Sequence, residues 1–489
     1  MTGPVPVPPR RRLPDGFTVR LDPRTRRRDG GATLLGGSPL RLLRLTPRAA
    51  ALLAGDRLEV RDPTGAALAA RLLDAGVAHP ALAPSAVGDV TVVIPVRDRP
   101  AELARLLGAL RADPRTATLP VVVVDDGSDV PVAAPAGVRV LRHPAPRGPA
   151  AARNTGLAAA GTELVAFLDS DCCPLPGWLD RLLPHLADPG LAAVAPRIVP
   201  LPGAARGWIS PYEDLAAALD MGTHPAAVRP LSSVSYVPSA ALLVRRAAVG
   251  DGFDPAMRVA EDVDLVWRLS GAGWRVRYEP AAEVAHEHPA GLRDWLRRRA
   301  FYGTGAALLA ARHGSAVAPV VLAPEAALTW ALAVGGGRAG RVAAAGLGGL
   351  TALRLARRLR RPGEPLPVAL ATVLTARGLA ASGQALARAA TRHHWPAAVG
   401  AALLSGRARR TVLAAALADG VLAWWPHRAR LGPVRWTAAR RLDDLAYGTG
   451  LWAGALRARD PRALLPARPP RTWHAVRECR PARTASPPA

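Results

Sequence analysis

The sequence contains no lysine, although it is strongly basic. Its 64 basic residues are therefore all arginine, and together with 38 acidic residues they give a formal charge of +26. Such a charge favours anionic partners: nucleotide phosphates, anionic lipid headgroups or nucleic acid. A GC-rich coding sequence, which enriches Arg, Ala, Gly and Pro, is an alternative source of part of it. Aromatic residues make up only 4% of the chain, and no basic platform interleaved with aromatics is present, so we expect no nucleic-acid partner.

Cysteine is also scarce. The three cysteines, Cys172, Cys173 and Cys479, form no disulfide framework and no Cys-x-x-Cys zinc pattern. The N-terminus has prolines and arginines but no apolar segment typical of a secretory signal. The longest apolar run, 314–337, carries Glu325 and two prolines, whereas a spanning helix needs about 18 apolar residues or more. We therefore expect a cytoplasmic protein, with the inner face of the plasma membrane as an alternative location.

Hydrophobic residues make up 49% of the chain and charged residues 21%, enough for a buried core in each of several domains. Residues 1–88 are expected to form a small unit of short strands and helices, one of them starting at Thr46 (N-cap) and Pro47. This pattern resembles the small winged-helix domains of the PqqD-like type, which hold the leader of a ribosomally made peptide. A simple lid or docking domain is the alternative.

Residues 89–300 alternate β-branched runs with helical segments, which predicts an α/β domain with a mostly parallel sheet covered on both faces. Ligands of such sheets bind beyond the carboxyl ends of the strands. Residues 301–440 are rich in Ala, Leu and Arg and are expected to be helical. They are either amphipathic helices in peripheral contact with a membrane or a soluble subdomain. Residues 441–489 are expected to be mostly disordered.

Acidic residues follow the first two predicted strands. Asp125 and Asp126 end the run VVVVDDGSD, where carboxylates can accept from a base N–H or from ribose hydroxyls. The loop after the first strand contains Pro95, Arg97 and Asp98 and is expected to form the other wall of a base pocket. Either motif alone is a common way to end a strand.

Phosphate ligands are predicted from RGPAAARNTG. Arg147 precedes a helix that bears Arg153 and Asn154, and both the helix N-terminus and the arginines would stabilise phosphate charge. The alternative is a simple loop that enters an Ala-rich helix.

A second acidic pair lies in VAFLDSDCCP. Asp169 and Asp171 leave a predicted buried strand two residues apart, so they repel each other unless a cation lies between them. Hard divalent ions prefer such oxygen ligands and keep positions for phosphate oxygens.

Two further groups complete the pattern. Glu261 and Asp262 open a predicted helix, where the macrodipole favours anions; Asp262 could act as a general base, or both acids could serve only as caps. His286 and His288 end a predicted strand and would point the same way in an extended segment. Neutral imidazole can complete a metal site, although a single histidine is more often structural.

The ordered set VIPVRD, VVDDGS, RGPAAARNTG, FLDSD, AEDVDLVWRL and GWRVRYEPAAEVAHEH resembles family 2 glycosyltransferases over about residues 89–300. The N-terminal segment and VSYVPSAALLVRRAAV are similar to those members of the family that glycosylate a peptide-derived redox cofactor. The resemblance implies a GT-A fold that uses a UDP-sugar donor and Mn²⁺ or Mg²⁺. It also implies inverting transfer of a hexose, glucose in particular, to a peptide-derived small-molecule acceptor.

The resemblance assigns roles by position. Asp98 and Asp126, helped by Asp125, would hold uracil and ribose, and Asp169 would lie near the ribose. Asp171 and His286, with His288 as the rival ligand, would hold the metal, and Asp262 would deprotonate the acceptor. The remaining expected contacts are Pro95, Arg97, Arg147, Arg153 and Asn154 on the donor side, and Glu261, Arg268 and His288 as acceptor or supporting residues.

One family motif is missing. Where relatives often carry Gln-x-x-Arg-Trp, this chain has DWLRRRAFYGTG without the glutamine, so processive synthesis is not supported. A membrane-associated transferase of cell-envelope glycan or glycolipid synthesis is the alternative from the same reaction class. An inactive nucleotide-sugar sensor is disfavoured because Asp171, Asp262 and His286 are all present.

Overall fold

The structure is a computed structural model. It describes residues 5–9, 11–53, 55–85, 88–204, 206–360, 363–469 and 477–478, the last two as backbone only. The chain divides into two compact units. Unit 1 comprises Met1–Arg206, Ala216–His288 and Thr472–Ala489, and unit 2 comprises Gly207–Leu215 and Pro289–Arg471.

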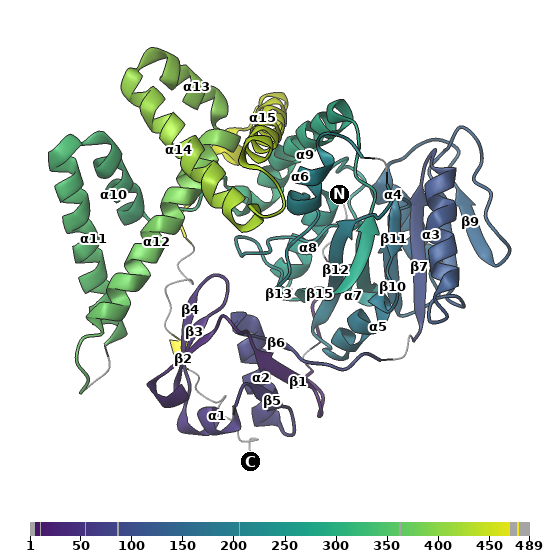
Figure 1. The fold of residues 1–489 in the computed structure, drawn as a ribbon. Helices are drawn as coiled ribbons and strands as arrows, with labels where there is room; N and C mark the ends of the chain where they lie inside the picture. The colour runs from purple at the N-terminus through teal and green to yellow at the C-terminus, as the bar shows by residue number, and fades with distance from the viewer. Residues whose placement is uncertain are drawn as a thin grey trace. The chain divides into compact units, whose positions relative to one another are not determined.

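The N-terminal part of unit 1 contains two small sheets and two helices (Figure 1). As predicted, Thr46 caps helix α1 by accepting from the backbone N–H of Ala49. The buried side chains of helix α2 form a core of their own with the strands around them. The elements are β1 (Thr18–Leu21), β2 (Arg26–Arg28), β3 (Thr33–Gly36), β4 (Arg41–Arg44), α1 (Pro47–Leu52), β5 (Arg57–Glu59), α2 (Pro63–Ala75) and β6 (Ala78–Pro80). The short strand β16 (Arg477–Glu478) pairs with β4.

The rest of unit 1 is a nine-stranded sheet with the order β11-β15-β12-β14-β10-β7-β8-β9, with β13 paired to β15. Strands β10, β7, β8 and β9 run parallel, whereas β14 is antiparallel to both β10 and β12. The predicted parallel arrangement is therefore confirmed in this first half, and the whole sheet is mixed. The strands are β7 (Val90–Val96), β8 (Val121–Asp125), β9 (Val138–Arg142), β10 (Leu164–Leu168), β11 (Cys172–Pro174), β12 (Leu191–Pro200), β13 (Ala226–Ala227), β14 (Ala241–Arg245) and β15 (Arg275–His286).

Helices lie beside this sheet (Figure 1). Strands β7 and β8 are buried along their whole length, which explains why their sequences are almost continuously β-branched. Leu103, Leu106 and Leu110 of α3 pack into the same core. The helices of this region are α3 (Pro100–Ala112), α4 (Pro149–Ala159), α5 (Trp178–Leu182), α7 (Arg246–Val249) and α8 (Glu261–Gly271).

Unit 2 is helical. Its long helices α9 and α15 pack so closely that a Cβ added at Gly450 would meet the carbonyl oxygen of Ala300. The unit is formed by most of α6 (Ser210–Ala216) with α9 (Leu292–His313), α10 (Pro324–Gly335), α11 (Gly337–Leu359), α12 (Val368–Arg388), the π-helix η4 (Ala389–His393), α13 (Trp395–Leu404), α14 (Gly406–Trp424) and α15 (Pro433–Ala458). Within the described residues, no helix combines the length and the apolar character that crossing a membrane requires.

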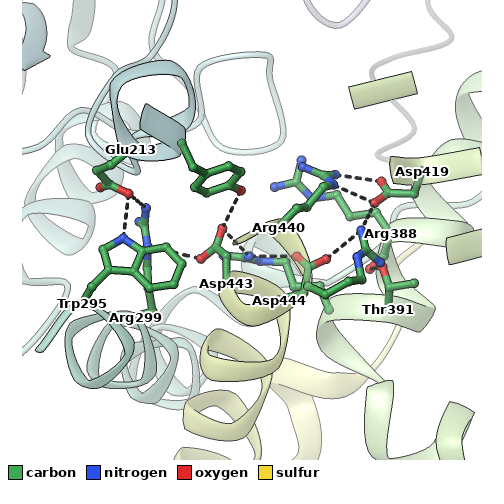
Figure 2. A network of polar contacts seen from close by, with 12 residues as sticks. Glu213, Trp295, Arg299, Arg388, Thr391, Asp419, Arg440, Asp443 and Asp444 are labelled. Carbon is green, nitrogen blue, oxygen red and sulfur yellow. Dashed lines mark hydrogen bonds and ion pairs between the residues drawn. The ribbon is translucent and has the colours of Figure 1, made fainter. Parts of the chain in front are cut away.

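A buried network of arginines and carboxylates joins α6, α9, η4, α14 and α15 (Figure 2). Glu213 accepts from Trp295 and Arg299, and Arg299 also pairs with Asp443 at 3.2 Å. Further along the network, Asp419 accepts two hydrogen bonds of 2.8 Å from Arg440. Burying charge requires such pairing, so the network helps to hold these five elements together.

Two predicted boundaries differ from the structure. The boundary between the two compact units falls between His288 and Pro289 instead of at residue 300. Residue 300 lies within α9, which is one continuous helix. Helix α15 takes in residues 441–458 of the stretch predicted to be mostly disordered. Residues 470–476 and 479–489 of that stretch, including Cys479, lie outside the described residues.

Candidate active site

The first acidic group lies where β7 and β8 end side by side. Pro95 is buried within β7, opposite Val124 of β8. Asp98 adopts a φ of +52°, a conformation that aspartate tolerates better than most residues. Its carboxylate accepts from the backbone N–H of Asp129, while its own N–H donates to the Ser128 hydroxyl. The two predicted walls of the base pocket are thus tied to each other.

Asp125 supports the loop after β8 from within. Its carboxylate is fully buried and accepts from the backbone N–H groups of Ser128 and Val132 and from Arg142. Burial alone would raise the pKa of Asp125, but the hydrogen bonds from Ser128, Val132 and Arg142 together outweigh burial and lower it.

Asp126 organises the entry to α4. Its carboxylate accepts from the backbone N–H groups of Arg147 at 2.9 Å and Gly148 at 2.8 Å, and it pairs with His143 at 2.7 Å. The side chain of Arg147 remains exposed. The carboxylate of Asp126, which was predicted to bind the nucleotide, therefore already accepts hydrogen bonds from the loop that precedes α4.

Arg153 occupies the centre of the acidic cluster. Its buried guanidinium donates to Asp169 at 2.5 Å and to Glu261 at 2.8 Å. The pKa of Asp169 is raised, because desolvation and the nearby negative charge of Asp171 outweigh the attraction of Arg153. The structure thus brings three of the predicted residues together, but it directs Arg153 to carboxylates.

Asp171 and His286 lie next to each other on neighbouring elements. Asp171 directly precedes β11, and His286 ends β15, which pairs with β11. The Oδ1 atom of Asp171 lies 3.4 Å from the Nε2 atom of His286, and its Oδ2 atom accepts from Arg99. The Nδ1 atom of His286 is buried without a hydrogen-bond partner among the described residues. The ring of His288 is centred 5.3 Å from that of His286.

Carboxylate oxygens suit Mn²⁺ and neutral imidazole is a common metal ligand, so Asp171 and His286 fit a metal that is also held by a donor diphosphate. Across the described residues, no three His, Cys, Asp or Glu side chains form a group that could hold a metal ion on their own. A metal site here would therefore need ligands from the bound substrate.

Asp262 lies in the first turn of α8. Its carboxylate accepts from the backbone N–H of Ser239 at 3.2 Å and from that of Val263 at 2.8 Å. Desolvation, followed by the negative charge of Glu261, raises the pKa of Asp262 to about 7. Ala260 caps the helix with a φ of +63°, a left-handed conformation that costs about 1–2 kcal/mol for a residue with a Cβ. A carboxyl that titrates near neutral pH is suited to general base catalysis.

Three predicted residues make other contacts. The side-chain amide of Asn154 makes two hydrogen bonds to the backbone of Phe253. Its Nδ2 donates to the carbonyl oxygen, and its Oδ1 accepts from the N–H. Arg268 donates to Asp264 and to the carbonyl oxygen of Gly252. Arg97 pairs with its neighbour Asp98 at 3.3 Å, and both side chains remain substantially exposed. Asn154 and Arg268 thus hold the loop around residues 252–253, and Arg97 stays at the surface beside the predicted base pocket.

Two residues of the site were missed in the sequence. Arg99, the N-cap position of α3, pairs with Asp171, and His143 pairs with Asp126 and contacts Thr155. Arg99 carried one usable signal, since it follows Asp98 in a loop already assigned to the site. His143 carried none, because a single histidine after a strand is not distinctive.

Comparisons with known proteins identify the family of this chain. The family model "Glycosyl transferase family 2" matches residues 91–250. Two curated proteins named Pre-mycofactocin glycosyltransferase, from two strains of Mycobacterium tuberculosis, are 50% identical over 472 residues, which is 93% of this chain and 98% of theirs. This chain belongs to the pre-mycofactocin glycosyltransferase family. It is a glycosyltransferase.

Other matches are more distant. Glycosyltransferase AglE of Haloferax volcanii is 28% identical over 214 residues, 41% of this chain and 67% of that protein. Among solved structures, a mannosyltransferase from Pyrobaculum calidifontis in complex with GDP-Man and Mn²⁺ matches at 22% identity with a TM-score of 0.35. That match covers 63% of this chain and 90% of the mannosyltransferase. The assignment to the family rests on the full-length relatives.

Proposed function

We propose that this glycosyltransferase transfers a hexose, glucose in particular, from a UDP-sugar to pre-mycofactocin, with inversion at the anomeric carbon. The observation that carries the acceptor is the 50% identity to proteins named for it, over 93% of this chain. The acidic cluster at the ends of β7, β8 and β10 supports a nucleotide-sugar donor.

The donor side is formed by loops that the chain has already fixed. We assign Asp98 to the nucleoside, because its loop is tied to that of Ser128 and its side chain remains partly exposed. Asp125 and Asp126 shape the same pocket through the loop hydrogen bonds described above. We assign the exposed Arg147, next to the start of α4, to the diphosphate, and Asp169, held by Arg153, to the ribose.

The metal would be Mn²⁺ or Mg²⁺, held by Asp171 and His286, with His288 as the rival ligand. When bound, it would stabilise the negative charge that develops on the departing diphosphate. Asp262 accepts the proton of the attacking acceptor hydroxyl, for which a pKa near 7 is well matched. Attack by the acceptor oxygen and departure of UDP occur on opposite faces of the anomeric carbon, which inverts its configuration.

The N-terminal part of unit 1 is proposed to hold the peptide-derived portion of the acceptor, as a PqqD-like unit would. Asp74 of its helix α2 contacts the transferase domain through Arg275 at 2.9 Å and also pairs with Arg229. Asp74→Ala is therefore expected to raise KM for the acceptor while KM for the donor stays unchanged. Equal changes in both constants would argue against this role.

The central test incubates the purified enzyme with UDP-glucose, Mn²⁺ and unglycosylated pre-mycofactocin and follows the acceptor by mass spectrometry. Mass gains in hexose steps support the proposal, and NMR of the new linkage reports its configuration. UDP-galactose and GDP-mannose serve as donor controls. If the acceptor gains no mass while a lipid acceptor is glycosylated, the enzyme is instead a transferase of cell-envelope glycolipid synthesis.

A further inference from the structure

The helices α10 to α14 of unit 2 bury small residues and expose large ones. Helix α11 buries only Gly340, Ala344, Ala352 and Ala356, and α12 buries only Ala371. Helix α13, with the sequence WPAAVGAALL, buries no residue at all. These five helices are fully described, and none of their leucines is among the buried residues. A surface helix of a water-soluble domain shows the opposite distribution, with its leucines facing the core.

Helices α13 and α14 form a hairpin (Figure 1), and the exposed fractions of its side chains show this inversion most clearly. Leu403 and Leu404 at the end of α13 are 78% and 90% exposed. In α14, Leu413 and Leu417 are 63% and 69% exposed, and their spacing of four places them on one face of the helix. The residues that α14 buries are instead Asp419 and Gly420. Small residues between helices and large aliphatic residues on the outside are typical of helices packed within lipid.

Arginines lie close to the turn of this hairpin. Exposed Arg409 and Arg410 follow the start of α14 at Gly406, which is two residues after Leu404. The side chain of Arg407 donates to the carbonyl oxygens of Val334 and Gly335 at the end of α10. The turn between α13 and α14 therefore lies against the turn between α10 and α11, where Arg338 and Arg341 are also exposed. Cationic side chains beside exposed leucines match an anionic headgroup layer.

We propose that the α13–α14 hairpin, together with the adjoining α10–α11 turn, lies in the interface of one leaflet of a membrane that contains anionic phospholipid. Arg409 and Arg410 lie close to the turn of the hairpin, between the exposed leucines of α13 and those of α14. The hairpin therefore lies along the leaflet, with its leucines among the acyl chains and its arginines at the headgroups. This proposal does not depend on the sugar or the acceptor of the reaction.

The test is flotation of the full-length enzyme with two kinds of vesicle, one of phosphatidylcholine alone and one of phosphatidylcholine and phosphatidylglycerol in equal amounts. The enzyme is expected to float with the mixed vesicles and much less with phosphatidylcholine. The variant Leu413→Ser/Leu417→Ser should partition roughly a hundredfold more weakly, because each leucine contributes a buried side chain. Arg409→Gln/Arg410→Gln should reduce binding to the mixed vesicles alone.

The matched control is Val7→Ser/Val130→Ser, since both valines are 78% exposed in unit 1; this variant should bind vesicles like the unchanged enzyme. Circular dichroism checks that each variant is folded. Failure of the unchanged enzyme to float, or equal flotation of the leucine variant, overturns the proposal. If the enzyme does not float and the leucine variant turns a dimer into a monomer on light scattering, a second copy covers this face instead.

Discussion

The guanidinium of Arg153 donates a hydrogen bond of 2.8 Å to the carboxylate of Glu261, which lies 108 residues further along the chain. Because Arg153 also holds Asp169, one buried cation links the end of β10 to the first turn of α8. The proposed base Asp262 follows Glu261 directly, so its position depends on this link.

Arg153→Met is therefore expected to destabilise the enzyme strongly. Removing one partner of a buried ion pair typically costs about 3–5 kcal/mol, and here two carboxylates would lose their cation. Urea unfolding followed by circular dichroism measures this change. Arg147→Met is the matched control: its exposed side chain should leave the free energy of unfolding unchanged and raise KM for the donor. Similar stability of the two variants would contradict the role given to Arg153.

The rate of transfer should depend on the ionisation of Asp262. Since its pKa is raised to about 7, the carboxyl is protonated below that pH and cannot accept a proton. We therefore expect kcat/KM for the acceptor to fall about tenfold per pH unit below 7 and to level off above it. Asp262→Asn should lower kcat roughly 10²–10⁴-fold and leave UDP affinity, measured by calorimetry, unchanged. A variant that retains turnover would show that another group is the base.

Several parts of the site could be predicted because each depends on a local pattern. A β-branched run followed by aspartate places the carboxylate at a strand end, which is why the positions of Asp98, Asp126 and Asp169 just after β7, β8 and β10 could be predicted. The partners of these groups depend on packing between distant segments. No spacing in the sequence indicates that Arg153 would be drawn to carboxylates, or that both ends of the Asn154 amide would bond to the backbone of Phe253.

The fold shows the same division. The alternation of strands and helices predicted the α/β domain, and the cap at Thr46 was confirmed. Strand β14 lies antiparallel between β10 and β12, and its sequence, ALLVR, does not distinguish this direction from a parallel one. In the C-terminal region, the Arg-rich composition did not indicate that several of these arginines form buried ion pairs. Asp419 pairs with Arg440, and Asp443 pairs with Arg392.

Arg99 is expected to compete with the metal for Asp171. Its guanidinium is paired with this carboxylate, so a divalent cation must displace the guanidinium before it can bind Asp171. Arg99→Ala should therefore bind Mn²⁺ about tenfold or more tightly in the absence of nucleotide, measured by electron paramagnetic resonance of the free ion. Arg105→Ala is the control, because Arg105 pairs with Glu287 instead. Unchanged or weaker Mn²⁺ binding in Arg99→Ala would rule out this competition.

The need for a metal and the choice between His286 and His288 as its ligand can both be tested. Chelation by EDTA should abolish transfer, and added Mn²⁺ should restore it. His286→Ala should weaken Mn²⁺ binding more than His288→Ala, because the Nε2 atom of His286 already lies 3.4 Å from Asp171. The reverse order would assign the metal to His288.

Two glycines of unit 2 should respond oppositely to the same substitution. A Cβ at Gly450 would lie 1.8 Å from the carbonyl oxygen of Ala300, so Gly450→Ala must push α15 away from α9. We expect a loss of about 2 kcal/mol or more, as for other overpacked positions. Gly346 lies within α11 with no atom within 4 Å of an added Cβ. Gly346→Ala should therefore stabilise the protein by about 0.5–1 kcal/mol, because alanine loses less backbone entropy in a helix. Thermal unfolding of both variants by calorimetry checks the two signs, and a destabilised Gly346→Ala would mean that α11 is packed there in solution.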